Sequence, residues 1–265
     1  MKSKLLTKIV PVVIAGEFSP MDISGLGLWL KADEGTYQDD GMGTPATADD
    51  DVVGGWEDQS GNGFDVTQAV AANKPLLKTG ILNGKPVLRF DKTNDYLSRA
   101  AVLGESDTQG TLFFVAGTDD ADQQMVLCIS DDASNSRRIL FGKAAIDDRM
   151  ELFQRAADVG EQIDGSTAVN DGVHRIFTFK SSGTVYTFYL NGTAEEINVV
   201  AGANNGDWIG DCSSLDVTAV GAWVYSGVVS YWEDDIAEII YYDTALSDAE
   251  REKVENYLGA KYGIT

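Results

Sequence analysis

The sequence predicts an all-β sandwich of two antiparallel sheets that carries one short C-terminal helix. The chain of 265 residues contains 28 glycines and only 5 prolines, a composition typical of tight turns between strands. Short runs rich in Val, Ile, Phe and Tyr recur along most of the chain and are separated by acidic or glycine-rich segments, which is the pattern of strands and turns. Hydrophobic residues make up 43% of the chain, enough for one sizeable core, and β-sandwiches of this length commonly form a single domain.

The first half of the chain contains the earliest expected strands and the longest loop. The run GLGLWLKA is expected to form a strand, and a loop rich in Asp, Gly and Thr follows it over residues 33–55. Within WEDQSGNGFDV, the residues Ser60, Gly61, Asn62 and Gly63 predict a tight turn, in which glycine adopts positive φ without steric cost. Further strands are expected in KPVLRFD, DYLS, TLFFVAG, QMVLCIS, RRILFG and MELFQR.

The second half contains the clearest hairpin, HRIFTFKSSGTVYTFYLNGT. Phe177 and Phe179 alternate with other residues on its first strand. Tyr186, Phe188 and Leu190 alternate in the same way on its second strand. The SSG between them is expected to form the turn. The runs VTAVGAWVY and DIAEIIYY then predict the late strands.

One helix is expected at the end of the chain. Ser247 is a favourable N-cap residue, and Glu250 three positions later completes the S-x-x-E capping box. Apolar residues, among them Leu258, then fall on one side of the segment, as in an amphipathic helix. We expect this helix to run to about Tyr262 and to end at Gly263, which suits the left-handed conformation that often follows a helix.

The acidic balance of the chain argues against nucleic-acid binding. The 42 Asp and Glu residues outnumber the 20 Lys and Arg residues, and the formal net charge is −22. Such a surface repels phosphate backbones. No apolar run approaches the roughly 18–20 residues that a membrane-spanning helix needs, so we expect no membrane span. An acidic surface is also compatible with divalent cations.

Several common kinds of functional site are absent from the sequence. Cys128 and Cys212 lie far apart without a CxxC motif, which excludes a structural zinc or iron–sulfur site. They form either one disulfide outside the cell or two buried thiols. His174, the single histidine, lies in a strand pattern and is expected to be structural. No GxSxG elbow, P-loop or dinucleotide fingerprint occurs.

The first twenty residues differ from the rest, and we treat 1–20 as an N-terminal arm and 21–265 as the folded domain. Lys2, Lys4 and Lys8 make the arm basic before its first acidic residue, in an otherwise acidic chain. A secretory signal is the alternative, but its apolar run is short and interrupted by a proline. We expect the arm to anchor the domain on an acidic or apolar neighbour.

The stretch WEDDIAEIIYY contains the spacing E-x-D-x-x-E in Glu233, Asp235 and Glu238. Retaining β-glucanases use this spacing for nucleophile, helper and acid/base. In a regular strand Glu233 and Asp235 share one face and Glu238 points to the other. Only a β-bulge brings all three together, and retaining chemistry then needs the outer carboxyls about 5–5.5 Å apart. The alternative is a structural strand.

Two further groups of residues are candidates for ligand binding. Asp91, Asn94 and Asp95 in RFDKTNDYL supply oxygen ligands within one turn, as calcium requires. The alternative, which we favour, is that these residues cap the turn through their own backbone. Trp208 lies in the turn-rich ANNGDWIGDCSS and is the best candidate for an exposed ring that stacks on a sugar. The alternative, which we favour, is packing in the core, as also expected for Trp29 and Trp223, which lie in strand patterns.

Four blocks of the sequence occur in an order that resembles one fold family. GLGLWLKADEG, VGGWEDQSGNGFDVTQ, NGKPVLRFDKTNDYL and DIAEIIYYDTALSDAEREKVENYLGAKYG resemble the laminin-G-like, concanavalin-A-like jelly-roll domains of bacterial surface proteins and tailed-phage virions. The resemblance covers roughly residues 22–265. It implies two antiparallel sheets in a curved sandwich whose rim loops often bind glycans or calcium. The opening FSPMDISGLGLWLKAD is most similar to phage structural proteins.

The resemblance also favours a structural role for the acidic stretch. DIAEIIYY matches the penultimate strand of non-catalytic laminin-G-like domains, directly before the closing helix. In the glucanases the motif lies in the middle of the chain, and position 234 is usually aliphatic, whereas this chain has Asp234. We therefore expect a structural strand and no enzyme.

These observations together predict a non-enzymatic virion protein of a tailed phage, in a capsid decoration, a fibre or a tail. Its partners would be other virion proteins and further copies of the chain, since such proteins usually assemble with closed symmetry. The domain would be lectin-like and bind host-surface glycans, with calcium as the only cofactor considered. The alternatives are a secreted, extracellular glycan-binding module and, less favoured, a retaining glycoside hydrolase that uses Glu233 and Glu238.

Overall fold

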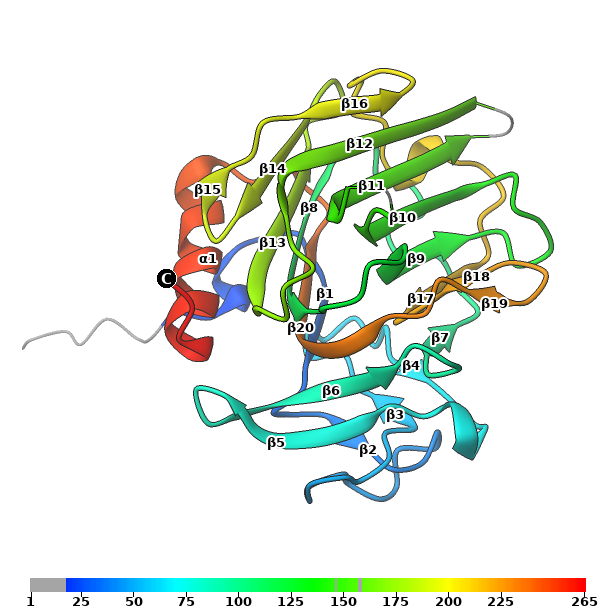
Figure 1. The fold of residues 1–265 in the computed structure, drawn as a ribbon, viewed down its shortest axis with the longest axis vertical. Coiled ribbons are helices and arrows are strands. Elements are labelled where there is room, and N and C mark those ends of the chain that lie inside the picture. Colours follow the sequence, from blue (N-terminus) through cyan, green and yellow to red (C-terminus); the bar gives the residue numbers. More distant parts are fainter. Residues whose placement is uncertain (1–17, 146, 157–158) are drawn as a thin grey trace, which may run out of the picture.

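Two antiparallel sheets pack face to face, and one helix lies outside them (Figure 1). The computed structural model describes residues 18–145, 147–156 and 159–265. The first sheet has eight strands in the order β15-β14-β13-β8-β20-β6-β5, and β1 also pairs with β20. Its strands are β1 (Leu26–Lys31), β5 (Leu76–Leu82), β6 (Lys85–Asp91), β8 (Gly110–Gly117), β13 (Arg175–Ser181), β14 (Tyr186–Leu190), β15 (Thr193–Ala194) and β20 (Glu233–Tyr242).

The second sheet has ten strands in the order β16-β12-β11-β10-β9-β17-β7-β4-β3-β2. They are β2 (Thr36–Tyr37), β3 (Gly55–Trp56), β4 (Val66–Thr67), β7 (Leu97–Arg99), β9 (Gln124–Ser130), β10 (Arg138–Lys143), β11 (Arg149–Ala156), β12 (Val159–Ala168), β16 (Asn198–Ala201) and β17 (Val217–Val220). A separate hairpin and short 3-10 turns complete the structure: β18 (Trp223–Val224), β19 (Val228–Val229), η1 (Pro20–Asp22), η2 (Ala71–Asn73) and η3 (Ile209–Asp211).

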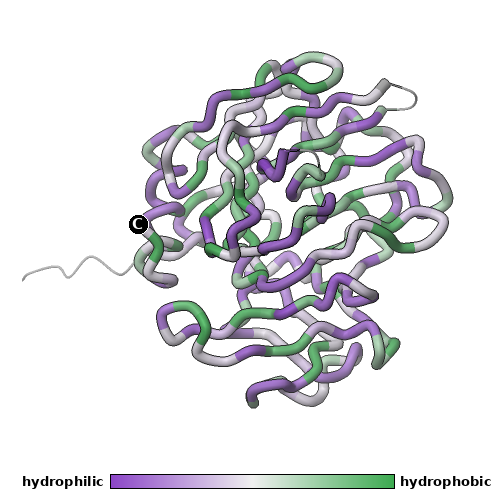
Figure 2. Tube along the Cα trace, in the orientation of Figure 1, coloured by the Kyte–Doolittle hydropathy of each residue, from purple (hydrophilic) through white to green (hydrophobic). Residues whose placement is uncertain are grey.

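The main core lies between the two sheets and is built by the alternation of side chains along each strand. In β8, Leu112 and Phe114 point into this core, whereas Phe113 and Val115 point to the outer face of the first sheet. Both faces of this sheet are covered, which explains why TLFFVAG reads as a continuous apolar run. Figure 2 shows hydrophilic and hydrophobic residues alternating along many of the other strands. The predicted all-β jelly-roll class is confirmed.

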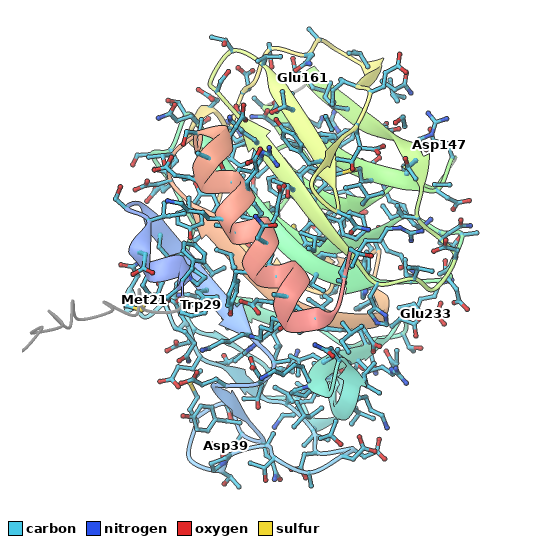
Figure 3. The ribbon with its side chains drawn as sticks, turned by 90° about the vertical axis from the view of Figure 1, so that its left-hand side faces the viewer. Met21, Trp29, Asp39, Asp147, Glu161 and Glu233 are labelled. Carbon is cyan, nitrogen blue, oxygen red and sulfur yellow. The ribbon has the colours of Figure 1, made fainter. Side chains whose placement is uncertain are left out.

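The C-terminal helix α1 (Asp248–Tyr262) covers the outer face of the first sheet (Figure 3). The side chain of Ser247 accepts from the backbone N–H of Glu250, and Gly263 follows the helix with a φ of 69°. The expected capping box and helix end are therefore confirmed. Val254 and Leu258 pack against apolar side chains of the sheet.

The strongest strand patterns are confirmed, and several weak ones were missed. The predicted hairpin is the pair β13–β14, in which Phe179 lies opposite Phe188. The two-residue strands of the second sheet and the polar strand β12 carry little apolar alternation, and nothing in the sequence singled them out. Among the residues that the structure describes, no helix has the length and apolar character to cross a bilayer.

Candidate ligand-binding face of the second sheet

The outer faces of the two sheets differ in what covers them. Helix α1 covers the first sheet, whereas, of the elements in the described residues, the small hairpin β18–β19 alone lies over the middle strands of the second sheet (Figure 1). The strand register sets Ser130, Arg138 and Arg155 side by side across β9, β10 and β11. Arg138 lies next to the core residue Ile139, so it and its two neighbours point away from the core. We call this surface the outer face of the second sheet.

Arg138 is the centre of this face. Only 8% of it is exposed, and its guanidinium carbon lies 4.5 Å from the ring centroid of Phe153 and 4.3 Å from that of Trp223. Its NH1 donates to the backbone oxygen of Asn135. Within the described part of the chain, no carboxylate forms an ion pair with Arg138, and neither its Nε nor the Nε1 of Trp223 has a hydrogen-bond acceptor. Two buried N–H donors of this cluster are therefore without acceptors among the described residues, which is energetically costly.

A second arginine lies beside Arg138 on this face. Arg155 lies directly opposite Arg138 in the register of β10 and β11, and like charges in directly opposite positions destabilise a sheet. Burial lowers the pKa of Arg138 to about 10, and the charge of Arg155 acts in the same direction. The two arginines therefore occupy neighbouring positions on the outer face of the second sheet.

Aromatic rings border the two arginines. Tyr225 stacks on Trp223 with ring centroids 4.2 Å apart and an interplanar angle of 28°. Tyr225 and Phe153 are both partly exposed. Flat aromatic faces pack against the apolar face of a pyranose ring. On the same side of the sheet, Thr67 lies opposite Ser98, and both line a pocket of about 440 Å³.

Two carboxyl groups with raised pKa values also belong to this face. Glu151 and Asp164 lie opposite one another on β11 and β12, and they are only 1% and 2% exposed. Gln123 donates to Glu151 Oε1 at 2.7 Å. Burial raises the pKa of Glu151 to about 7 and that of Asp164 to about 6. Such shifts are common at functional sites, but the burial of both groups keeps them from direct contact with a large ligand.

The acidic stretch of β20 lies on the other sheet and is engaged in structural contacts. A β-bulge at Ala237, between Ile236 and Glu238, breaks the expected alternation, so Asp235 and Glu238 both lie on the outer side of the first sheet. The expectation that Glu238 faces away from Asp235 was therefore wrong. Arg89 donates to both oxygens of Asp235, at 2.8 and 2.9 Å.

His174 completes the contacts of Asp235, with its Nε2 at 3.0 Å from Oδ2. Burial by itself raises the pKa of Asp235, but the hydrogen bonds from His174 and Arg89 lower it below its usual value. The histidine thus has a structural partner, as the sequence predicted.

Glu238 is fully buried between the first sheet and helix α1. Trp29 Nε1 donates to its Oε1 at 2.6 Å. Lys261 Nζ and the hydroxyl of Tyr262 donate to its Oε2 at 2.7 and 2.8 Å. Glu233 is partly exposed at the start of β20. A substrate that reaches Glu233 therefore has no access to Glu238, and the pair lacks the arrangement that retaining hydrolysis requires.

Trp208 does not have the exposed ring that a sugar-stacking site needs, so its candidate ligand-binding role was wrong and the favoured alternative, packing in the core, is confirmed. Its exposed fraction is 0%, its ring packs edge-on against Phe141 with centroids 5.3 Å apart, and its Nε1 donates to the hydroxyl of Tyr241 at 3.3 Å. Trp208 and its neighbour Ile209 both belong to the core cluster between the sheets, so the indole is part of the core. Trp29 and Trp223 are both buried, as expected, but Trp223 belongs to the outer face of the second sheet rather than to the main core.

The turn at 91–95 has the backbone geometry of a capped turn. Asp91 Oδ1 accepts from the backbone N–H groups of Thr93, Asn94 and Asp95, at 2.8, 3.1 and 3.3 Å. This is the favoured alternative to a calcium site. Asn94 Oδ1 is nevertheless buried without a donor, and burial raises the pKa of Asp95 to about 7. Calcium binding by these oxygens stays a prediction.

A different group of carboxylates lies close together in the described residues. One oxygen each from Asp131, Asp132 and Asp216 falls within 4.8 Å of the others. These residues follow β9 and precede β17, next to the tip of the hairpin β18–β19, where Ser226 Oγ donates to the backbone oxygen of Ala133. This group could not be found from the sequence, because Asp216 is remote from the other two residues along the chain.

Two further predictions concern the cysteines and the arm. Cys128 and Cys212 are both buried and free, so the thiol alternative is confirmed, and burial raises the pKa of each to about 11. Lys2, Lys4 and Lys8, the proposed anchoring residues, lie outside the described residues.

No protein-family model and no curated protein matches the chain, whereas many solved structures do. One is the CBM40 domain of a Ruminococcus gnavus sialidase bound to α2,3-sialyllactose, with 19% identity, a TM-score of 0.50, and coverage of 57% of this chain and 84% of that domain. A second is a Streptococcus pneumoniae sialidase, with 17% identity, a TM-score of 0.51, and coverage of 62% and 26%. A third is a Trypanosoma rangeli sialidase in complex with sialic acid, with 13% identity, a TM-score of 0.56, and coverage of 95% and 35%.

These similarities show the fold. The chain spans most of the CBM40 domain but only about a quarter to a third of the two sialidases. None of the three is a phage protein. At these identities the comparison establishes a jelly-roll sandwich of the kind that carbohydrate-binding modules have.

Proposed function

We propose that this domain binds glycans on the outer face of its second sheet and does so without catalysis. The observation that carries the proposal is the cluster of Arg138, Phe153, Trp223 and Tyr225, which presents partly exposed rings around a buried arginine that lacks an ion-pair partner among the described residues. Aromatic rings stack on sugar rings, and arginine donates to sugar oxygens. The carbohydrate-binding-module-like fold supports the proposal, because one similar domain is bound to sialyllactose.

The test is a glycan array followed by calorimetry on the best binders. Replacing Tyr225 with alanine removes one stacking surface from the rim of the site and is expected to weaken binding about two- to tenfold, since such ring contacts contribute roughly 0.5–1.5 kcal/mol. Tyr189→Ala is the matched control, because Tyr189 also contacts an arginine, Arg251 at 3.8 Å, but belongs to the first sheet. Binding of no glycan by the wild-type protein would overturn the proposal.

The proposed absence of catalysis is supported by the burial of the candidate acidic residues. Glu238 is buried beneath α1, and Glu151 and Asp164 are covered as well. Glycans that bind are therefore expected to be recovered intact after prolonged incubation, as measured by mass spectrometry. Release of a cleaved product that depends on Glu151 would refute this part while leaving glycan binding in place.

We further propose that the domain is displayed on a tailed-phage virion, with an extracellular binding module as the alternative. The support is the resemblance of the opening sequence to phage structural proteins and the charge of Lys2, Lys4 and Lys8, which complements an acidic neighbour. Deletion of residues 2–18 is expected to reduce incorporation into particles, measured by quantitative mass spectrometry of purified virions. Undiminished occupancy would remove the anchoring role. Light scattering on the full chain tests the expected homo-oligomer.

A further inference from the structure

The strand β16 forms one end of the second sheet, and in the described residues its outer edge has no partner strand (Figure 1). We propose that β16 (Asn198–Ala201) pairs in the antiparallel direction with the same strand of a second copy of the chain. The second sheets of the two molecules then join into one continuous sheet. This inference names the surface through which the expected homo-oligomer forms, and it does not depend on glycan binding.

The first argument is the exposure of β16. All of its residues are exposed, and the exposed fractions of Val199 and Val200 are 45% and 46%. Its backbone pairs with β12 on one side, and no other backbone hydrogen bond joins this strand to the described residues. Such an edge presents a row of free N–H and C=O groups, which a strand of another molecule can satisfy.

The second argument is that the other sheet edges are covered or short. A loop covers β5 at the end of the first sheet, where the backbone N–H of Leu77 donates to the backbone oxygen of Asp51 at 2.8 Å. A loop also covers β1, because the backbone N–H of Gln59 donates to the backbone oxygen of Trp29 at 2.8 Å. The edge strands β2 and β15 have only two residues each, and short edges limit unwanted pairing. The edge of β16 has neither kind of protection from the described residues.

The third argument identifies the partner as a second copy. Residues 197–206 carry no charge, although Glu195 and Glu196 precede them and Asp207 follows. Because β16 lies near the middle of this uncharged segment, antiparallel pairing sets Glu196 of one copy beside uncharged residues of the other. Parallel pairing would instead set the glutamates of the two copies side by side, and like charges in such positions are destabilising. The charge pattern therefore fits self-association in the antiparallel direction.

The proposed pairing also determines how two copies are displayed. Identical strands that pair antiparallel are related by a twofold axis perpendicular to the sheet, which gives a closed contact. The outer faces of the two second sheets then lie on the same side of the joined sheet. Two candidate glycan sites on one side bind a glycan-coated surface with avidity, and this consequence alone rests on the proposed function.

The test measures self-association of the full chain by sedimentation velocity at increasing protein concentration. We expect a monomer–dimer equilibrium that sodium chloride strengthens, because salt screens the repulsion between two chains of net charge −22. The replacement Val200→Asp sets like charges close together at the twofold axis and is expected to raise the dimer dissociation constant about tenfold or more. Val173→Asp is the matched control, since Val173 is 51% exposed and precedes β13 of the first sheet. Thermal melting confirms that each variant is folded.

Amide hydrogen exchange locates the contact. Exchange of residues 198–201 is expected to slow as the wild type and Val173→Asp dimerise, because the free N–H groups of the edge become hydrogen-bonded, whereas Val200→Asp keeps the fast rate. A protein that stays monomeric at every concentration, even with added salt, would overturn the proposal. A dimer that Val200→Asp leaves intact, or one that forms without protecting residues 198–201, would overturn it as well.

The outcomes separate this inference from the proposed function. Val200→Asp is expected to bind a soluble oligosaccharide as the wild type does and to lose only the avidity for a glycan-coated surface. A blank glycan array together with a dimer that Val200→Asp dissociates refutes glycan binding and supports the edge contact. Glycan binding by a protein that is monomeric under all conditions supports the proposed function and refutes the edge contact.

Discussion

Replacing Lys261 with methionine is expected to lower the free energy of unfolding by about 3 kcal/mol. Lys261 Nζ lies 2.7 Å from Glu238 Oε2 and 2.7 Å from Asp33 Oδ1, and Glu238 is fully buried. Removing one member of a buried ion pair costs about 3–5 kcal/mol, because the other charge is left uncompensated. We expect the lower end of this range, since Trp29 and Tyr262 still donate to Glu238. Methionine also keeps most of the volume of the lysine stem, so no large cavity opens.

Urea unfolding monitored by tryptophan fluorescence measures this change, and an unchanged m-value shows that two-state behaviour persists. Lys253→Met on the same helix is the control, because Lys253 is exposed and its replacement leaves the midpoint nearly unchanged. The double variant Glu238→Gln, Lys261→Met is expected to be more stable than Lys261→Met alone, since no charge is then left buried. A loss below about 1 kcal/mol for Lys261→Met would refute the reasoning that this ion pair joins the helix to the sheet.

Three further predictions follow from the structure. Trp208→Ala is expected to cost about 3–5 kcal/mol in urea unfolding, because the indole is fully buried against Phe141; a near-neutral effect would contradict its place in the core. Burial raises the pKa of Glu151 from 4.5 to about 7, so the folded state keeps this proton to a higher pH than the unfolded chain, and stability falls as the pH rises through that interval. Between about pH 5 and pH 8 the melting temperature of Glu151→Gln is therefore expected to fall less than that of the wild type. An equal fall in both proteins would argue against a raised pKa of Glu151. Sodium chloride is expected to raise the melting temperature by screening the net charge of −22, and calcium chloride of matched ionic strength shows whether carboxylates such as Asp131 bind calcium beyond that screening.

The helices and strands that could be predicted from the sequence are those marked by residues within the same short segment of the chain. Helix α1 was predictable because Ser247, Glu250 and Gly263 mark its ends within the chain itself. Strands such as β8 and β9 were predictable from dense runs of apolar and β-branched residues. The two-residue strands of the second sheet were not predictable, because pairing with neighbours rather than their own composition makes them strands.

The candidate binding face shows the limit of this reasoning. Arg138 in RRILFG and Arg155 in MELFQRA each appear as an arginine at the end of an apolar strand, a common position for a solvated charge. The register of β10 against β11 makes them directly opposite neighbours, and the hairpin β18–β19 brings Trp223 over Arg138. The signal that could have found them is the presence of an arginine at one end of each of two strands that are consecutive in the sequence.

The sequence by itself determined the β-sandwich class, the C-terminal helix and its caps, and the acidic surface, because each of these depends on composition or on residues a few positions apart. Only the tertiary structure decided which carboxylates and rings a ligand can reach. The alternation of a strand predicts that neighbouring side chains point to opposite sides of the sheet, but not which side another element covers. A single bulge at Ala237 also reverses the side to which each later residue of β20 points. The covering elements come from distant parts of the chain: α1 buries Glu238, and the turn around Trp208 folds inward. Whether a side chain is exposed depends on those long-range contacts, and for that reason the short motifs of this chain could not reveal the candidate binding face.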